Sequence, residues 1–182
     1  MAKKDKKAAP VDLQSPENKL LMQLKDGVVT IQLRPDWAPK HVARIKELVR
    51  EGFYDGIIFH RVIEGFMAQT GDPTGTGMGG SSKPNLKAEF SRNPHDRGVC
   101  SMARSQNVDS ANSQFFICFK NAGFLDGQYT AWGVVIDGMG YVDKITRGEP
   151  PANPDKMISV KVLADTLSEV SAETPDAIAQ VL

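Results

Sequence analysis

The feature that most constrains this chain is a series of short apolar runs between residues 53 and 136, each broken by Gly, Pro, Asn or Asp. The runs are 57–59, 66–69, 99–102, 115–119 and 130–136. Each is too short for a helix of ordinary length, whereas a strand is commonly about 4–8 residues long. Because many short strands joined by loops are typical of a sandwich or a barrel, the sequence predicts a mainly β domain.

The flanking segments add a hairpin and a last strand. Apolar and polar residues alternate on both sides of Asp26-Gly27, a dipeptide that favours a tight turn, so residues 19–34 are predicted to form a hairpin. A Pro-rich loop at 149–154 leads to residues 158–163, which are predicted to form the final strand. With 182 residues in all, one domain of ordinary size is expected.

Two helices are also predicted. The first starts at Pro39 and ends at Gly52. Its apolar stripe comprises Val42, Ile45, Leu48 and Val49. Its other face is expected to be solvated and comprises Lys40, Arg44, Lys46, Glu47, Arg50 and Glu51. The second helix has Asp137 as its N-cap and ends at Gly148, and its stripe comprises Met139, Val142 and Ile145.

Both ends of the chain are expected to be tails. The first ten residues carry four lysines, but residues 11–18 are too polar and broken to be the apolar run of a signal peptide. No window approaches the roughly 20 apolar residues of a membrane span. We therefore expect a flexible Lys-rich tail at 1–17, one domain at 18–165 and a tail at 166–182. Thr174 to Asp176 could cap a short helix there. A cytoplasmic protein is expected.

Charge and cysteine content argue against nucleic-acid binding and against a metal site. Lys plus Arg and Asp plus Glu both number 22, so the formal net charge is zero and attraction to nucleic acid is not indicated. Cys100 and Cys118 lie in apolar runs, which predicts buried free thiols, although a disulfide stays open at this stage. Neither cysteine has a Cys or His neighbour at metal-ligand spacing, so no metal site is predicted.

Two further patterns lack the context that would make them functional motifs. Gly75-x-Gly77-x-x-Gly80 has the spacing of a dinucleotide-binding motif, but residues 81–85 break any following helix, so a flexible surface loop is expected. The three histidines are accompanied by no Gly-x-Ser-x-Gly sequence, which argues against a hydrolase. His60 lies in an apolar stretch and is expected to be a hydrogen-bonded core residue.

Three clusters mix polar and large apolar side chains: Arg61 with the residues up to Gln69, Gln114 to Phe116, and Phe124 to Tyr129. Taken alone, they are compatible with ordinary core and strand positions. Strand alternation places Phe66, Ala68 and Thr70 on one face and Met67 and Gln69 on the other. It also places Gln114 and Phe116 together. Because an unpaired Gln is costly to bury, a face carrying both Gln and Phe or Met suits a groove better than a dry core.

At these residues the sequence resembles the cyclophilin-type peptidyl-prolyl cis/trans isomerases, and its loops resemble those of the short bacterial cyclophilins. Residues 59–72, FHRVIEGFMAQTGD, are similar to the family's main signature. Further similar blocks are 101–103, 113–117, 125–127 and 132–139. The similarity runs from about Leu20 to Ala164. It implies a closed eight-stranded antiparallel β-barrel capped by two helices, with the active groove on its outside.

The resemblance also implies a set of site residues. The catalytic residues would be Arg61 and Gln69. The substrate-binding residues would be Phe66, Met67, Ala103, Gln114, Phe116, Phe124, Leu125 and Tyr129. Four positions depart from the family pattern: Phe124 stands where Trp is frequent, Tyr129 where His is frequent, Arg104 where many members have Asn, and Glu64 where Pro is common. These departures bear on drug affinity and peptide preference more than on the reaction.

The implied activity is rotation about X–Pro peptide bonds in proteins, which assists folding and needs no cofactor and no metal. The expected partners are proline-containing polypeptides, with cyclosporin as a further ligand of reduced affinity. No nucleic acid and no membrane partner is expected, and a monomer is expected. Two alternatives remain open. One is a proline-peptide-binding chaperone or interaction module with little turnover, and the other is a barrel that acts only as a scaffold through its tails.

Overall fold

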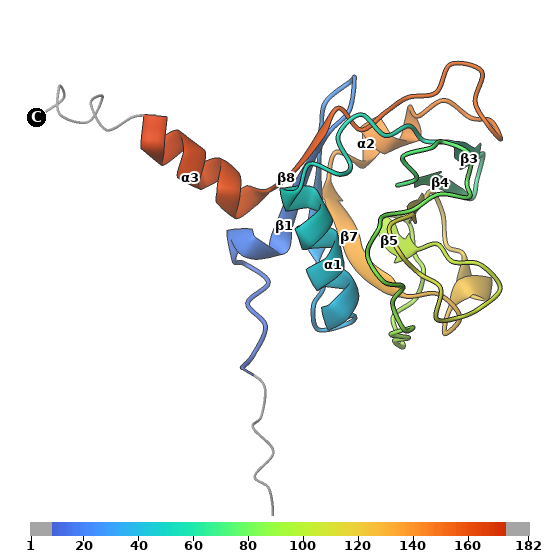
Figure 1. The fold of residues 1–182 in the computed structure, drawn as a ribbon, viewed down its shortest axis with the longest axis horizontal. Coiled ribbons are helices and arrows are strands. Elements are labelled where there is room, and N and C mark those ends of the chain that lie inside the picture. Colours follow the sequence, from blue (N-terminus) through green and yellow to red (C-terminus); the bar gives the residue numbers. More distant parts are fainter. Residues whose placement is uncertain (1–8, 174–182) are drawn as a thin grey trace, which may run out of the picture.

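Residues 9–173 are described in a computed structural model, and they form a curved antiparallel sheet with helices around it (Figure 1). The strands are β1 (Lys19–Gln23), β2 (Val28–Leu33), β3 (Arg61–Ile63), β4 (Met67–Thr70), β5 (Val99–Met102), β6 (Phe115–Cys118), β7 (Ala131–Asp137) and β8 (Ser159–Val162). The helices are α1 (Pro39–Arg50), α2 (Met139–Asp143) and α3 (Leu163–Glu173), with 3-10 turns η1 (Pro16–Asn18) and η2 (Gly123–Leu125). None of the helices in this part of the chain has the length and apolar character needed to cross a bilayer.

The predicted hairpin and final strand are confirmed. β1 pairs with β2 from Lys19 opposite Gln32 to Gln23 opposite Val28, and β8 then pairs with the free side of β1. The turn depends on Gly27, because a Cβ at this position would lie 2.5 Å from ring carbons of Tyr141. The hairpin and β8 therefore form one end of the sheet.

The sheet is an open half-barrel, so the predicted closed barrel is wrong. Its strand order is β3-β4-β6-β5-β7-β2-β1-β8, and within residues 9–173 no ladder joins the two edge strands. The run 57–59 does not form a strand; Ile58 makes a single bridge with Lys156, and Val62 exchanges two 2.8 Å hydrogen bonds with Gly148. A regular closing strand is not available, because the prolines of the 149–154 loop have no N–H to donate to a ladder.

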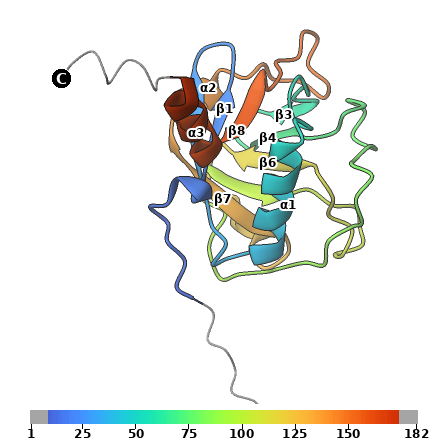
Figure 2. The ribbon, with the colours of Figure 1, turned by 60° about the vertical axis from the view of Figure 1, so that its left-hand side comes forward.

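Helix α1 follows the prediction, with one exception. Its stripe of Val42, Ile45, Leu48 and Val49 is buried in the main core, and the helix lies across the curved sheet (Figure 2). Arg44, expected to be solvated, is only 6% exposed and donates hydrogen bonds to the carbonyl oxygens of Pro84 (2.6 Å) and Asn112 (3.3 Å). Loops from distant parts of the sequence cover that side of the helix, and local periodicity does not report them.

The other two helices differ more from expectation. Asp137 is the last residue of β7, and Gly138, in the left-handed conformation with φ of 82°, is the N-cap of α2. α3 is a third helix that extends away from the sheet (Figure 1). Its Asp165 accepts hydrogen bonds from Arg50 of α1, which also pairs with Glu17. The helix expected to start at residues 174–176 lies outside the described residues.

The core has two parts, on the two faces of the sheet. The main core includes Cys100, Ile117 and Trp132 with the stripe of α1. A smaller apolar cluster contains Met67, Phe116 and Cys118. Both thiols are therefore buried and free, as predicted, and their packing in different clusters explains why they form no disulfide.

Leu48→Ala tests the packing of α1 on the main core. Leu48 is fully buried, so the substitution should lower the free energy of unfolding by about 2–5 kcal/mol, measured by urea denaturation. Lys40→Ala, on the exposed side of the same helix, is the control and should change stability by less than about 0.5 kcal/mol. Equal effects of the two substitutions would contradict this account of the core.

Candidate functional site

The site begins with one row of residues across the outer face of the sheet. Arg61 of β3 is opposite Gln69 of β4, Gln69 is opposite Phe116 of β6, and Phe116 is opposite Ser101 of β5. Directly opposed residues of an antiparallel ladder have their side chains on the same face. The neighbouring row, which includes Val62, packs into the main core. Strand register therefore puts a cation, an amide and an aromatic ring side by side.

A pocket of about 150 Å³ opens beside this row, and we call it the apolar pocket because six of its nine lining residues are Phe, Met, Ala, Leu or Tyr. It is lined by Arg61, Phe66, Met67, Gln69, Ala103, Arg104, Phe116, Leu125 and Tyr129. Eight of the ten residues implied by the family resemblance meet here. Of the other two, Gln114 lies in an adjoining cavity, and Phe124 is 67% exposed outside the lining.

Phe66 does not lie where alternation placed it. It precedes the first residue of β4, and its ring packs with the outer-face cluster and against Phe124, at 5.4 Å between ring centroids. Ala68 packs in the main core, so the predicted common face with Phe66 is wrong. The reason is that the period of two holds only within the strand, and Phe66 is part of the turn that enters it.

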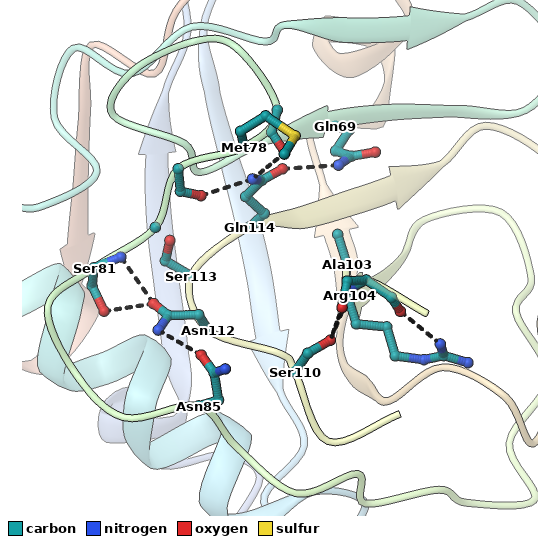
Figure 3. Close-up of a pocket in the computed structure, with 14 residues that line it drawn as sticks. Gln69, Met78, Ser81, Asn85, Ala103, Arg104, Ser110, Asn112, Ser113 and Gln114 are labelled. Carbon is teal, nitrogen blue, oxygen red and sulfur yellow. Dashed lines mark hydrogen bonds between the residues drawn. The ribbon is translucent and has the colours of Figure 1, made fainter. Parts of the chain in front are cut away.

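A cavity of about 430 Å³, lined mainly by polar residues (Figure 3), shares Gln69, Ala103 and Arg104 with the apolar pocket. Gln69 Nε2 donates a 3.0 Å hydrogen bond to Gln114 Oε1. Gln114 Nε2 in turn donates to the carbonyl oxygens of Gly77 (3.0 Å) and Gly79 (2.8 Å). These bonds satisfy the amide of Gln114 and fix the orientation of Gln69, whose Oε1 points away from Gln114 (Figure 3).

The glycine-rich loop is organised by Asp72. Its carboxylate accepts hydrogen bonds from the Thr74 hydroxyl (2.7 Å) and from the N–H groups of Thr74, Gly77 and Gly79. Burial alone raises the pKa of Asp72, but these hydrogen bonds outweigh it and lower the pKa to about 2. The loop thus holds the carbonyl oxygens that orient Gln114. The sequence indicated no nucleotide here, and the glycines allow the backbone to approach this carboxylate closely.

The other wall of the apolar pocket is supported by His95 and Asp126, which sequence reasoning did not single out. Asp126 Oδ1 accepts from the His95 N–H at 2.8 Å and lies 2.9 Å from His95 Nδ1, while His95 Nε2 lies 2.8 Å from Ser101 Oγ. Hydrogen bonds from the His95 backbone and ring lower the pKa of Asp126. The His95 ring also stacks on Phe116. No local sequence pattern predicts the contact between His95 and Asp126, which are 31 residues apart.

His60 differs from expectation. It is buried, but neither ring nitrogen has a hydrogen-bond partner. The ring faces Gly77, whose N–H is already bonded to Asp72 and whose carbonyl is bonded to Gln114. Burial lowers the pKa of His60, and Arg61 adds to this lowering against the opposite effect of Asp72. The ring of His60 is therefore neutral near pH 7, and it lines the same cavity as Arg61.

Of the four positions that depart from the family pattern, Arg104 and Tyr129 line the apolar pocket, whereas Glu64 and Phe124 do not. The guanidinium of Arg104 lies 4.5 Å from the ring centroid of Tyr129 and donates to the carbonyl oxygens of Gln128 and Ser105. Glu64 pairs with Arg147. Arg104 and Tyr129 therefore alter the edge of the pocket, whereas the row formed by Arg61, Gln69 and Phe116 is unaffected.

The site can bind and polarise an uncharged ligand. It combines an apolar pocket, a permanently charged guanidinium and amide groups held in place. Burial raises the pKa of both thiols, to about 12 for Cys118, so neither is a thiolate near neutral pH. The arrangement therefore suits electrostatic stabilisation of a bound amide rather than attack by a thiolate.

Sequence comparison identifies relatives of this chain. The profile of the family described as cyclophilin type peptidyl-prolyl cis-trans isomerase/CLD matches residues 19–162. A Brucella suis protein named probable peptidyl-prolyl cis-trans isomerase is 54% identical over 167 residues, which cover 83% of this chain and 85% of the relative. Mouse peptidyl-prolyl cis-trans isomerase-like 1 is 36% identical over 160 residues, covering 86% of this chain and 95% of its own.

Solved structures with the same fold include two cyclophilins. The crystal structure of a Hirschia baltica cyclophilin has a TM-score of 0.78 at 31% identity and covers 83% of this chain and 76% of its own. A Cryptosporidium parvum cyclophilin, crystallised in the presence of the dipeptide Ala-Pro, has a TM-score of 0.74 at 28% identity. It covers 79% of this chain and 98% of its own.

Asp72→Asn tests the role of the Asp72 carboxylate in the loop. The folded-state pKa of about 2 lies below the ordinary value, so this carboxylate stabilises the fold above about pH 4 and loses that contribution as pH falls towards 2. The variant should therefore be less stable than the wild type at pH 7, and the difference should shrink between pH 4 and 2. Urea midpoints across this range measure it. A constant difference would mean that another group is responsible.

Proposed function

The chain belongs to the cyclophilin-type peptidyl-prolyl cis-trans isomerases, and we propose that it catalyses rotation about X–Pro bonds with the proline held in the apolar pocket on the outer face of β3, β4 and β6. The barrier to this rotation is about 18–20 kcal/mol, because the amide C–N bond has partial double-bond character. Without catalysis the exchange takes tens to hundreds of seconds. The protein accelerates it by binding the twisted amide better than either planar form.

Arg61 supplies the electrostatic part of this mechanism. When the amide twists, conjugation is lost and the prolyl nitrogen becomes a better hydrogen-bond acceptor. A fixed guanidinium can stabilise that state, because it stays charged and presents its donors in a rigid plane. The observation that carries the proposal is that Arg61 lines the same pocket as Phe66, Met67 and Phe116.

The remaining residues bind the peptide. Phe66, Met67, Phe116 and Leu125 enclose the proline ring, which is apolar and fits a pocket of about 150 Å³. Gln69, held by Gln114, offers its Oε1 to a peptide N–H. At Ala103 the N–H already donates to the carbonyl oxygen of Gln114, so its own carbonyl oxygen is the backbone group offered to the peptide. Proline-containing polypeptides are the proposed substrates. The presence of Ala-Pro with the Cryptosporidium parvum cyclophilin supports this choice.

The main alternative is a module that binds proline peptides with little turnover. It predicts binding without exchange, whereas the proposed function predicts both. A protease-coupled assay with a panel of X–Pro peptides separates the two. A part in protein folding follows from the reaction, since prolyl isomerisation can limit folding rates. The cytoplasmic location, the monomeric state and the flexibility of the tails stay predictions from the sequence.

Arg61→Ala tests the mechanism. The loss of one donor to the transition state should lower kcat/KM by at least about 100-fold in the protease-coupled assay. Stability should change little, because the side chain is 46% exposed and its ion pair contributes little. Arg34→Ala, which removes an ion-paired arginine outside the pocket, should retain full activity. Full activity of Arg61→Ala would refute the mechanism.

Phe124→Trp tests the proposed weak binding of cyclosporin. Phe124 lacks an indole N–H, and one missing hydrogen bond costs about 0.5–1.5 kcal/mol, to which the smaller buried area of the ring adds. The Trp variant should therefore bind cyclosporin about tenfold more tightly. Its kcat/KM should stay within a few-fold of the wild type, since Phe124 lies outside the lining of the pocket. If titration shows no gain in affinity, Tyr129 is the next position to change.

A further inference from the structure

Arg61 is held by a carboxylate from a distant part of the chain. Its Nε donates a 2.9 Å hydrogen bond to Oε1 of Glu149, 88 residues away in sequence. Within residues 9–173 this is the one hydrogen bond of the guanidinium, so Nη1 and Nη2 keep their N–H groups for a ligand. The carboxylate thus occupies one side of the fork and leaves the other side open.

Glu149 is held in place by its neighbours in the chain. Gly148, immediately before it, exchanges two 2.8 Å hydrogen bonds with Val62, immediately after Arg61. Arg147 donates to the carbonyl oxygens of Asp143 and Ile145, and its guanidinium lies over the ring of Phe119 at 4.2 Å from the centroid. The backbone that carries Glu149 is therefore fixed against the strand that carries Arg61.

Arg61 lines two cavities. One is the apolar pocket, and the other is a second cavity of about 420 Å³ lined by His60, Arg61, Gln69, Gly75, Thr76, Gly77, Glu149 and Pro150. A long, half-exposed arginine has several rotamers, and in only some of them would it reach a ligand in the apolar pocket. Loss of this freedom on reaching the transition state costs free energy unless the side chain is already ordered.

We propose that Glu149 is a positioning residue: its hydrogen bond to Nε of Arg61 orders the guanidinium so that the free Nη groups are presented to the twisted amide. The proposal rests on the proposed function. The bond does not sequester Arg61, because the two side chains are 46% and 55% exposed and such a pair is weak. The hydrogen bond favours one orientation of the Arg61 side chain and leaves its guanidinium able to bind a ligand.

Glu149→Ala, Glu149→Gln and the matched control Glu17→Ala test this role. Glu17 is also a partly exposed glutamate that pairs with an arginine, Arg50, but it lies outside the three cavities. In Glu149→Ala, kcat should fall about three- to fivefold with KM nearly unchanged, the scale of coupling that an exposed ion pair allows. Glu149→Gln keeps an acceptor for Nε and should recover part of the loss. Glu17→Ala should match the wild type.

A double-mutant cycle with Arg61→Ala supplies the decisive comparison. If Glu149 acts through Arg61, Glu149→Ala should change nothing further in the Arg61→Ala background. An equal loss in both backgrounds would overturn the proposal in favour of a merely structural role. Higher activity of Glu149→Ala would overturn it in favour of competition with the substrate. Wild-type activity of Glu149→Ala, with Arg61→Ala still impaired, would overturn the role of Glu149 and leave the proposed function intact. Full activity of Arg61→Ala would instead refute the proposed mechanism itself.

Discussion

The site depends on the hydrogen-bond register of β4 with β3 and β6. This register puts Arg61, Gln69 and Phe116 in one row on the outer face and sends the next row, with Val62 and Ile117, into the main core. A slip by one residue would exchange the two faces, burying the cation and exposing the core. The free energy that keeps apolar residues out of water therefore also fixes the groups of the groove. Stability and function are specified by the same ladder.

Two carboxylates convert this row into a defined pocket. Asp72 accepts hydrogen bonds from hydroxyl and N–H groups of the glycine-rich loop. Carbonyl oxygens of this loop accept hydrogen bonds from Gln114, which in turn accepts one from Gln69. On the other side, Asp126 holds His95, whose ring stacks on Phe116. Each carboxylate accepts several hydrogen bonds, and its lowered pKa reports how well it is satisfied. These hydrogen bonds tie loops without regular structure to the residues of the site.

Prediction from the sequence succeeded where the signal was local and failed where partners were distant. The period of two and the turn at Asp26-Gly27 identified the hairpin, and the stripe of α1 identified its buried face. The predicted closed barrel was wrong because the prolines of the 149–154 loop prevent a ladder. The segments that would have to pair lie far apart in the sequence. The prediction that Arg44 is solvated was wrong for the same reason, since the carbonyl oxygens that accept its hydrogen bonds lie 40 and 68 residues away in the sequence. Glu149 lies in a loop whose composition carries no sign of a contact with Arg61.

The proposed reaction, rotation about an amide bond, explains why the groove needs no activated nucleophile. Rotation about an amide transfers no proton and forms no bond to the protein, so a nucleophile with a shifted pKa has no part in it. What matters is a fixed charge, an apolar surface and ordered amide groups. The guanidinium of Arg61 supplies the charge, and the neighbouring His60, whose pKa is lowered by burial, adds no competing positive charge near neutral pH. In the proposed mechanism the orientation of the Arg61 guanidinium is the variable on which the rate depends, and its hydrogen bond to Glu149 and the register of β3 with β4 restrict it.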